Sequence, residues 1–386
     1  MNFSRSISFK SVFTVFLLLI GFSFSAFSQA EHHEVSAGAE SHHEEGEKKI
    51  NVKEIIFGHI RDAHDWHLFS IGDFHATLPL PVILYSPDKG LSVFMSSKFE
   101  HGHAEHNGYK QINDHDLEAD AALHNGKSNL VKGKIIALDG SEVYDFSITK
   151  NVLSMLISLA LLWFLLTGIA KKYKKNGINK APTGWQNAVE PVIGFIEDNV
   201  AKPYLGKKSG KYMPLLLTFF FFIWINNLMG LLPGGANLTG NIAVTLVLTL
   251  IFFVVMLFNS NKYFWGHIFN PPGIPFGIKL ILVPIEILSN LLIKPAALAI
   301  RLFANIFAGH TIILSLVCMI FIFGAMNKAV GYGFSIVTVG FSVFMFFLEL
   351  LVAAIQAFIF TNLVAVFIGQ AVEEHHHDEH AVEAHH

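Results

Sequence analysis

The chain has 386 residues, of which 52% are hydrophobic and 15% are charged, and 37 of them are Phe. This composition is unlike that of a soluble enzyme domain and is typical of a polytopic membrane protein. The formal net charge of -3 averages a polar N-terminal part and an apolar remainder, so it is uninformative about partners. We expect no nucleic-acid partner. The single cysteine, Cys318, excludes an intramolecular disulfide.

The first thirty residues carry a targeting pattern. Arg5 and Lys10 precede an apolar stretch, residues 12–27, which ends in small residues around Ala30. We therefore predict a cleaved signal peptide over residues 1–30, with the mature chain beginning between about residues 27 and 32. The alternative is an uncleaved anchor, but the stretch is short for a membrane span.

A polar segment follows the signal peptide. Residues 31–49 are rich in His and Glu and have almost no large apolar side chains, so we predict that they are disordered. In residues 50–147, the sequence predicts short strands at 75–85, 90–99 and 132–138, separated by Pro, Gly and Asp turns. We expect residues 50–147 to form a small extramembrane β-rich module.

Hydrophobic stretches dominate the rest of the chain. There are five, at about residues 148–170, 213–232, 242–258, 277–324 and 331–370. They predict an all-α polytopic membrane protein, with about five transmembrane or strongly tilted helices in a membrane domain at 148–370.

The distribution of lysine predicts the orientation. Nine Lys lie between residues 171 and 211, which places that side in the cytoplasm, whereas the connector 233–240 has no Lys or Arg and is external. Alternating spans then put the 50–147 module in the periplasm and the acidic His-rich tail, 371–386, in the cytoplasm. The predicted location is a bacterial cell inner membrane.

The last two stretches are too long for perpendicular spans. A helix of about 40 residues reaches ~60 Å, about twice the hydrocarbon thickness of a bilayer. These stretches must therefore tilt, kink or break. Pro295 predicts one break, because proline removes a backbone donor and biases the residue before it away from helix.

One arginine follows Arg61 in the sequence, and this residue, Arg301, lies in an apolar setting. A guanidinium within a membrane is costly, so it indicates a partner or a wet cavity. The alternative is an arginine that snorkels to the headgroups, but apolar sequence continues for several turns on both sides. On a helix, Asn305 lies only about 40° from Arg301, whereas His310 lies about half a turn away.

Polar side chains recur in the other apolar stretches. Glu349 and Gln356 are seven residues apart, and therefore share one stripe of the last helix. The membrane part also contains Asn226, Asn227, Glu286 and Asn362. Carboxylate, imidazole and amide groups in series can pass protons or hold water, so the pattern predicts ion translocation.

Three segments carry a family resemblance, namely "KPAALAIRLFANIFAGH", "FLELLVAAIQAFIFTNL" and "INNLMGLLPG". Over residues 148–370, the chain resembles subunit a of F-type ATP synthases, the membrane stator beside the rotating c-ring. The resemblance implies that Arg301 faces the c-ring carboxylate and separates two half-channels. It implies that Asn305 lies one turn from this arginine and that Gln356 faces it.

The resemblance also implies an external half-channel that passes Glu349, His310 and Asn227. His310 and Glu349 occupy two positions whose residues are exchanged in some members of the family. Glu286 resembles the family's acidic residue upstream of the arginine, although its spacing to Lys294 is one residue longer than the family pattern. The implied role is that of a non-catalytic subunit without cofactor or metal, whose partners are the c-ring, the peripheral-stalk b subunit, other ATP synthase subunits and membrane lipid.

Two other functions deserve comparison. A metal-ion transporter is suggested by His-rich clusters such as "HGHAEH" and "EEHHHDEHAVEAHH", but these lie outside the spans and lack a fixed ligand spacing. A haem-carrying subunit needs axial ligands within the membrane, and only His310 lies deep in an apolar stretch. A purely structural subunit gives no reason for the cost of Arg301.

Overall fold

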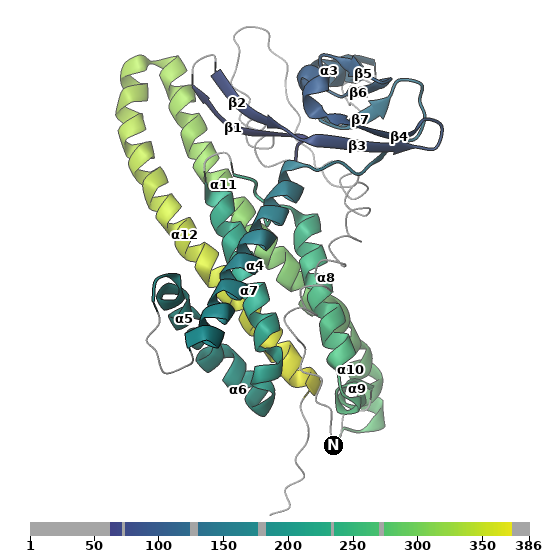
Figure 1. The fold of residues 1–386 in the computed structure, drawn as a ribbon, viewed down its shortest axis with the longest axis vertical. Coiled ribbons are helices and arrows are strands. Elements are labelled where there is room, and N and C mark those ends of the chain that lie inside the picture. Colours follow the sequence, from purple (N-terminus) through teal and green to yellow (C-terminus); the bar gives the residue numbers. More distant parts are fainter. Residues whose placement is uncertain are drawn as a thin grey trace, which may run out of the picture.

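The computed structural model describes residues 62–71, 74–123, 130–176, 183–232, 235–269 and 274–372 (Figure 1). The predicted signal peptide, the His/Glu-rich segment 31–49 and the tail from residue 373 lie outside the described residues. The described chain consists of a strand-rich module at one end of a helix bundle (Figure 1).

The described part of the module contains three small antiparallel sheets. β1 (Asp65–Ile71) pairs with β2 (Phe74–Pro79). β3 (Pro81–Ser86) lies between β4 (Gly90–Met95) and β8 (Tyr144–Asp145). The third sheet contains β5 (Glu105–His106), β6 (Tyr109–Gln111) and β7 (Ile135–Ala137), and two short helices complete the module, η1 (Ser96–Gly102) and α3 (Asp114–Leu123).

Alternation along β3 explains the core of the module. Val82 and Leu84 are fully buried against Phe99 and Tyr109, whereas the residues between them point to the other face. The three predicted strand segments are confirmed as β2 with β3, β4 and β7. The strand predicted over residues 90–99 ends at Met95, because the Ser96 hydroxyl accepts a hydrogen bond from Leu80 N and the chain turns into η1.

Among the described residues, five helical segments are long and apolar enough to cross a membrane, in agreement with the predicted number. They contain α4 (Lys150–Asn176), α7 (Ser209–Leu231, at the end of a segment that begins at Trp185), α8 (Ile242–Asn259), α10 (Phe276–Leu288) continuing into α11 (Lys294–Met326), and α12 (Lys328–Val372). Shorter helices that we did not predict connect them: α5 (Trp185–Ile196), η2 (Glu197–Ala201), α6 (Lys202–Leu205), η3 (Gly206–Lys208) and α9 (Lys262–Phe269).

The two longest apolar stretches exceed the ~20 residues of a perpendicular membrane span, and they accommodate the extra length in different ways. α12 runs unbroken for 45 residues and crosses the bundle obliquely (Figure 1). The other stretch is interrupted by a π-helical turn, η4 (Ser289–Ile293), after which α11 begins with Pro295 in its first turn. The predicted break before Pro295 is wrong in form: Lys294 keeps helical dihedrals (φ -61°, ψ -50°), because a proline in the first turn of α11 needs no backbone donor there, and the irregularity is a π-helical turn within a continuous helical segment.

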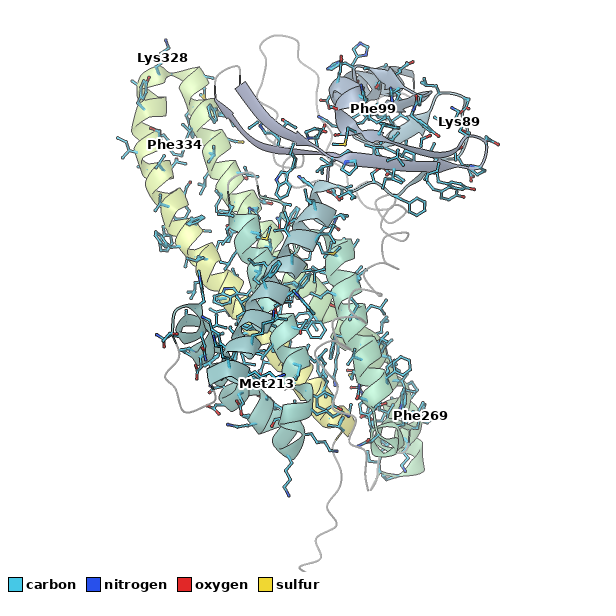
Figure 2. The ribbon with its side chains drawn as sticks, in the orientation of Figure 1. Lys89, Phe99, Met213, Phe269, Lys328 and Phe334 are labelled. Carbon is cyan, nitrogen blue, oxygen red and sulfur yellow. The ribbon has the colours of Figure 1, made fainter. Side chains whose placement is uncertain are left out.

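Aromatic side chains hold the bundle together. Phe219 on α7 contacts Phe252 on α8 and Phe360 on α12, with ring centroids 6.4 and 5.7 Å apart. Figure 2 shows apolar side chains along the outer faces of the helices as well. Phe164 and Phe258 are 72% and 86% exposed, which is the surface expected where lipid surrounds a bundle.

Candidate functional site

Arg301 lies about two turns into α11, with its side chain exposed at the surface of the bundle. The neighbouring Leu298 and Leu302, about 60° and 100° away around the helix, are buried. No described residue forms a hydrogen bond or an ion pair with the guanidinium. The positive charge is therefore available to a group outside this chain.

Asn305 and Gln356 join the two long helices beside this arginine. The Asn305 side-chain amide donates a hydrogen bond of 2.7 Å to Gln356 Oε1. Gln356 is 1% exposed, and its Nε2 has no hydrogen-bond partner among the described residues. Asn305 is exposed like Arg301, which confirms that the two share a face.

His310 and Glu349 form a second group, one to two turns further along α11. His310 Nε2 lies 3.7 Å from Glu349 Oε1 across the α11–α12 contact. Glu349 is only 4% exposed, and neither of its carboxylate oxygens accepts a hydrogen bond from a described residue. A buried carboxylate beside an imidazole can take up and pass a proton.

Gly309 makes room for this carboxylate. A Cβ built at Gly309 would lie 2.7 Å from Glu349 Oε1 and 2.8 Å from its Cδ. Any larger residue at position 309 would therefore displace the carboxyl group. The close approach of α11 to Glu349 depends on this glycine.

Asn227 connects the same group to the connector between α7 and α8. Its side-chain amide donates to the Ala353 carbonyl on α12 at 3.2 Å, and its Oδ1 accepts a hydrogen bond of 2.8 Å from the Thr239 hydroxyl. Gly230 lies between Asn237 and His310, since a Cβ there would be 3.7 Å from Asn237 Oδ1 and 3.8 Å from His310 Nε2. Gly230 on α7 thus lies close to both the connector and the histidine.

Thr239 and Asn237 are site residues that our sequence reasoning missed. They lie in "PGGANLTG", which reads as a turn because of its glycines and proline. Only the absence of charge in this connector marked it as external. Its buried hydroxyl and amide groups were not distinguishable from ordinary turn residues.

The strand-rich module covers this connector. Trp66 and Leu80 from the module pack against Ala236, which is completely buried, and Leu153 of α4 packs against the same cluster. Ala236 directly precedes Asn237. The module therefore holds in place the segment that contacts Asn227.

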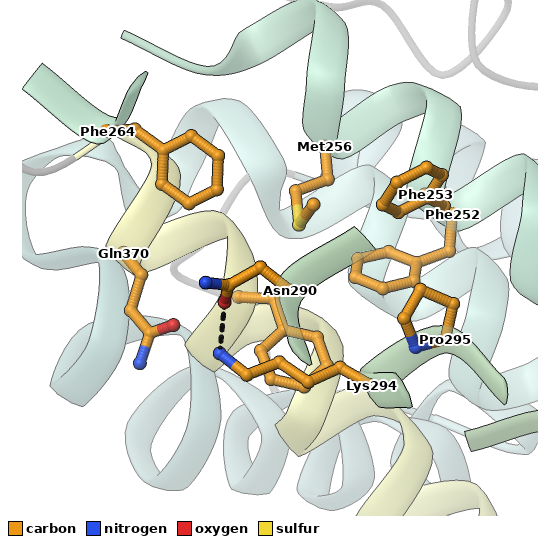
Figure 3. A pocket seen from close by; sticks show the side chains of 9 residues that line it. Phe252, Phe253, Met256, Phe264, Asn290, Lys294, Pro295 and Gln370 are labelled. Carbon is orange, nitrogen blue, oxygen red and sulfur yellow. Dashed lines mark hydrogen bonds between the residues drawn. The ribbon is translucent and has the colours of Figure 1, made fainter. Parts of the chain in front are cut away.

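Glu286 belongs to a third polar group at the other end of the long helices. Asn290 donates to the Glu286 carbonyl at 2.9 Å, and Lys294 Nζ donates to Asn290 Oδ1 at 2.5 Å. Lys294 and Asn290 line a small cavity of about 10 Å³ together with Gln370 and several aromatic residues (Figure 3). Such a volume is close to that needed for one water molecule.

The predicted site residues are thus brought together in three places. Arg301, Asn305 and Gln356 form the first group, on α11 and α12. His310 and Glu349 on the same two helices form the second group, together with Asn227 of α7. Glu286 lies apart, with Lys294 nearby. His310 and Arg301 lie on different faces of α11, as their spacing on the helix predicts.

These features define a polytopic membrane protein whose bundle carries separated groups of proton-accepting side chains on either side of an exposed arginine. A sequence model of the family described as ATP synthase A chain matches residues 152–369. The chain therefore belongs to the ATP synthase A chain family. A second model, described only as a domain of unknown function, matches residues 55–146.

Curated proteins similar to this chain carry the description ATP synthase subunit a. "ATP synthase subunit a 2" of Chlorobaculum tepidum is 42% identical over 247 residues, which cover 62% of this chain and 68% of the relative. "ATP synthase subunit a" of Pelodictyon phaeoclathratiforme is 40% identical over 292 residues, covering 74% of this chain and 83% of the relative. The second alignment is longer than the stretch from residue 148 to residue 386, so it extends into the module.

Proposed function

We propose that this chain is the proton-translocating stator of the membrane sector of an F-type ATP synthase, with Arg301 facing the ionised carboxylate of a c-ring subunit. The observation that carries the assignment is the exposed guanidinium within an apolar helix, which no described residue neutralises. A charge in this position is costly unless an anion outside the chain meets it. The family membership supports the same partner.

The second group is the external half-channel in this proposal. A proton passes the connector at Thr239 and Asn227, reaches His310 and Glu349, and then neutralises a c-subunit carboxylate. The neutral carboxyl group rotates into lipid, where its charged form is too costly. Arg301 attracts the next bare carboxylate and its positive charge blocks direct passage of protons between the half-channels.

Glu286, Asn290 and Lys294 mark the cytoplasmic half-channel in the same scheme. They lie towards the ends of the long helices that pack near the lysine-rich segment 199–211, where Lys208 donates a hydrogen bond to the Val372 carbonyl. Lysine enrichment supports a cytoplasmic location for that end. The module and the 233–240 connector are then periplasmic, and the C-terminal tail is cytoplasmic.

Export of the module requires the signal peptide, residues 1–30, which we propose is cleaved. Sequencing the N-terminus of the protein in its assembled complex should find it between about residues 27 and 32. Recovery of Met1 would show that the segment stays as an anchor. We also propose that the peripheral-stalk b subunit is a neighbour, which cross-linking within the complex would test.

Substitution of the arginine tests the central claim. Arg301→Ala should abolish both ATP-driven proton pumping and proton-driven ATP synthesis in membrane vesicles while the complex still assembles. Arg301→Lys should restore little, because the compact ammonium lacks the planar fork of the guanidinium. Ile300→Ala is the matched control, since Ile300 is exposed on the same turn but uncharged.

The Arg301→Ala variant distinguishes a role of the arginine in proton translocation from a structural role. Passive proton leak through the Arg301→Ala membrane sector should persist or rise, because the positive barrier is gone. A variant that still synthesises ATP at a substantial fraction of the normal rate would show that Arg301 is structural. The alternative function, metal-ion transport, gains no support from the comparisons, and the described residues hold no group of three metal-binding side chains.

A further inference from the structure

One face of the β4–β3–β8 sheet is both apolar and exposed. Leu91, Val93 and Met95 on β4 are 67%, 61% and 43% exposed. They lie opposite Tyr85, Ile83 and Pro81 on β3 in the antiparallel register. On the third strand, Tyr144 pairs with Tyr85, and Phe146 N donates to the Ile83 carbonyl. We call this set the apolar sheet face.

The face lies on the side of the sheet nearer the helices. The other face carries Val82 and Leu84, which are buried under Phe99, Tyr109 and Ile135. Figure 1 shows α3, β5, β6 and β7 on the side of β3 and β4 that is away from the bundle. The apolar sheet face therefore points in the direction in which the helices, and the membrane around them, lie.

The connection to α4 fixes the height of this face above the membrane. Only four residues separate Asp145 of β8 from Lys150 at the start of α4. Ile148 N donates to the Pro81 carbonyl, and Lys150 N donates to the Ala63 carbonyl, at 3.1 and 2.9 Å. The link is therefore held by hydrogen bonds rather than free to extend.

Hydrocarbon begins close by. Leu156, six residues inside α4, is exposed and apolar, and six residues of helix span only about 9 Å. The four-residue link spans at most about 17 Å even when extended. The sheet face must therefore lie at or just outside the headgroup level of the outer leaflet.

Its chemistry matches that location. Tyr and Trp rings are enriched at membrane interfaces, where the ring lies in the apolar boundary and the hydroxyl remains hydrated. The Tyr144 hydroxyl donates to Glu142 at the edge of the face, and no Asp, Glu, Lys or Arg lies within the set itself. A contiguous apolar surface of this kind is uncommon on the water-exposed side of a soluble module.

We propose that the apolar sheet face rests on the outer leaflet of the bilayer, so that the module binds lipid beside the helix bundle. This gives the domain of unknown function a binding surface, with the interfacial region of phospholipid as its ligand. The proposal rests on the embedding of the helix bundle in the membrane and does not depend on the proposed proton path. A result that contradicts the lipid contact therefore does not contradict the proton path, and the reverse also holds.

Spin labels on the intact ATP synthase complex in phospholipid vesicles test this contact. One label is attached at Val93→Cys and a control label at Lys98→Cys, both with Cys318→Ser to remove the native thiol. Lys98 is exposed on η1, which packs against the covered face. Collision with oxygen, which concentrates in lipid, is compared with collision with a water-soluble nickel chelate.

The label at Val93 should collide with oxygen several-fold more than with nickel, and the label at Lys98 should show the reverse. Equal nickel access at both sites would overturn the proposal, because the face would then lie in water. Exclusion of both reagents at Val93 would also overturn it, because another protein chain would then cover the face.

A second measurement avoids any loss of assembly caused by the cysteine variants. Tyr85→Trp adds one indole to the face, and its fluorescence should be quenched by lipids brominated near the headgroup. Lys98→Trp is the control and should not be quenched beyond the unsubstituted complex. Absence of extra quenching at position 85 in a complex that pumps protons normally would overturn the proposal.

Discussion

Gly309→Ala should slow proton uptake without disrupting the bundle. The new Cβ would lie 2.7 Å from Glu349 Oε1, whereas unstrained heavy-atom contacts lie near ~3.5 Å. The carboxylate must therefore withdraw by about 0.8 Å. If the carboxylate also withdraws from His310, its separation from His310 Nε2, now 3.7 Å, passes the ~4 Å limit of a close ion pair.

The energetic cost is modest. Overpacking a tightly packed site costs about 1–3 kcal/mol, and alanine recovers about 1 kcal/mol over glycine within a helix. The net strain of ~0–2 kcal/mol leaves the protein assembled. If this strain destabilises the protonated Glu349 carboxyl group, the rate of proton transfer drops by roughly tenfold, since 1.4 kcal/mol corresponds to a factor of ten.

Proton pumping into inverted membrane vesicles, driven by ATP and followed with a pH-sensitive dye, measures this rate. Gly210→Ala is the matched control, because a Cβ at Gly210 meets nothing within 4 Å. Combining Gly309→Ala with Glu349→Asp shortens the acidic side chain by one methylene and should restore part of the lost rate. Normal pumping by Gly309→Ala, or a double variant no faster than the slower single one, would refute the reasoning.

Three further predictions concern the same region. The double exchange Glu349→His with His310→Glu should retain more ATP synthesis than either single change, and activity no better than the worse single variant would contradict the coupling. Trp66→Ala should lower pumping several-fold in an assembled complex, because Ala236 loses its cover and the connector loosens; unchanged pumping would disprove this positioning role. Burial disfavours charge on His64, but the hydrogen bond and charge of Asp145, with Asp62 and Asp65, outweigh it and raise the pKa of His64 above 6.5. The stabilisation of the module by charged His64 is therefore complete below pH ~6.5 and lost as pH rises through the raised pKa. The protection factors of the β3 amides, which correct for the base-catalysed intrinsic exchange rate, should fall at high pH in the wild type but not in His64→Gln.

The helices of the membrane domain were predictable because their signal is strong. Long apolar runs have few alternatives to helix in a membrane, and α4, α7, α8 and α12 begin and end within a few residues of the predicted stretches. The short helices α5, α6 and α9 were missed, because each mixes lysine or glycine with apolar residues over a length too small for periodicity to appear. In the module, β5 and β8 contain two residues each, and such bridges leave no pattern in a sequence.

The candidate site residues were predictable because charged and polar side chains are energetically costly inside a membrane. Arg301, Glu349 and Gln356 stand out in apolar sequence, and helical spacing correctly separated His310 from Arg301. Side-chain contacts between helices were not predictable. The hydrogen bond from Asn305 to Gln356 joins residues 51 apart in the sequence, and it depends on how α11 packs against α12. Gly309 gave no signal at all, because its role is to leave space for a side chain on another helix.

The π-helical turn Ser289–Ile293 bears on how this helix tolerates changes of length. An extra residue in a regular α-helix rotates everything beyond it by about 100°, which would turn Arg301 away from its partner. A π-helical turn closes its hydrogen bond over one more residue than an α-helical turn does, and so takes up the additional residue locally. The resemblance in sequence implies that the spacing from Glu286 to Lys294 is one residue longer than the family pattern, and the wide turn lies between these two residues. The number of residues between Glu286 and Lys294 can thus change by one while Arg301 keeps its angular position on the helix. Deletion of one residue from 289–293 should convert the π-helical turn to α-helix without changing the direction in which Arg301 points.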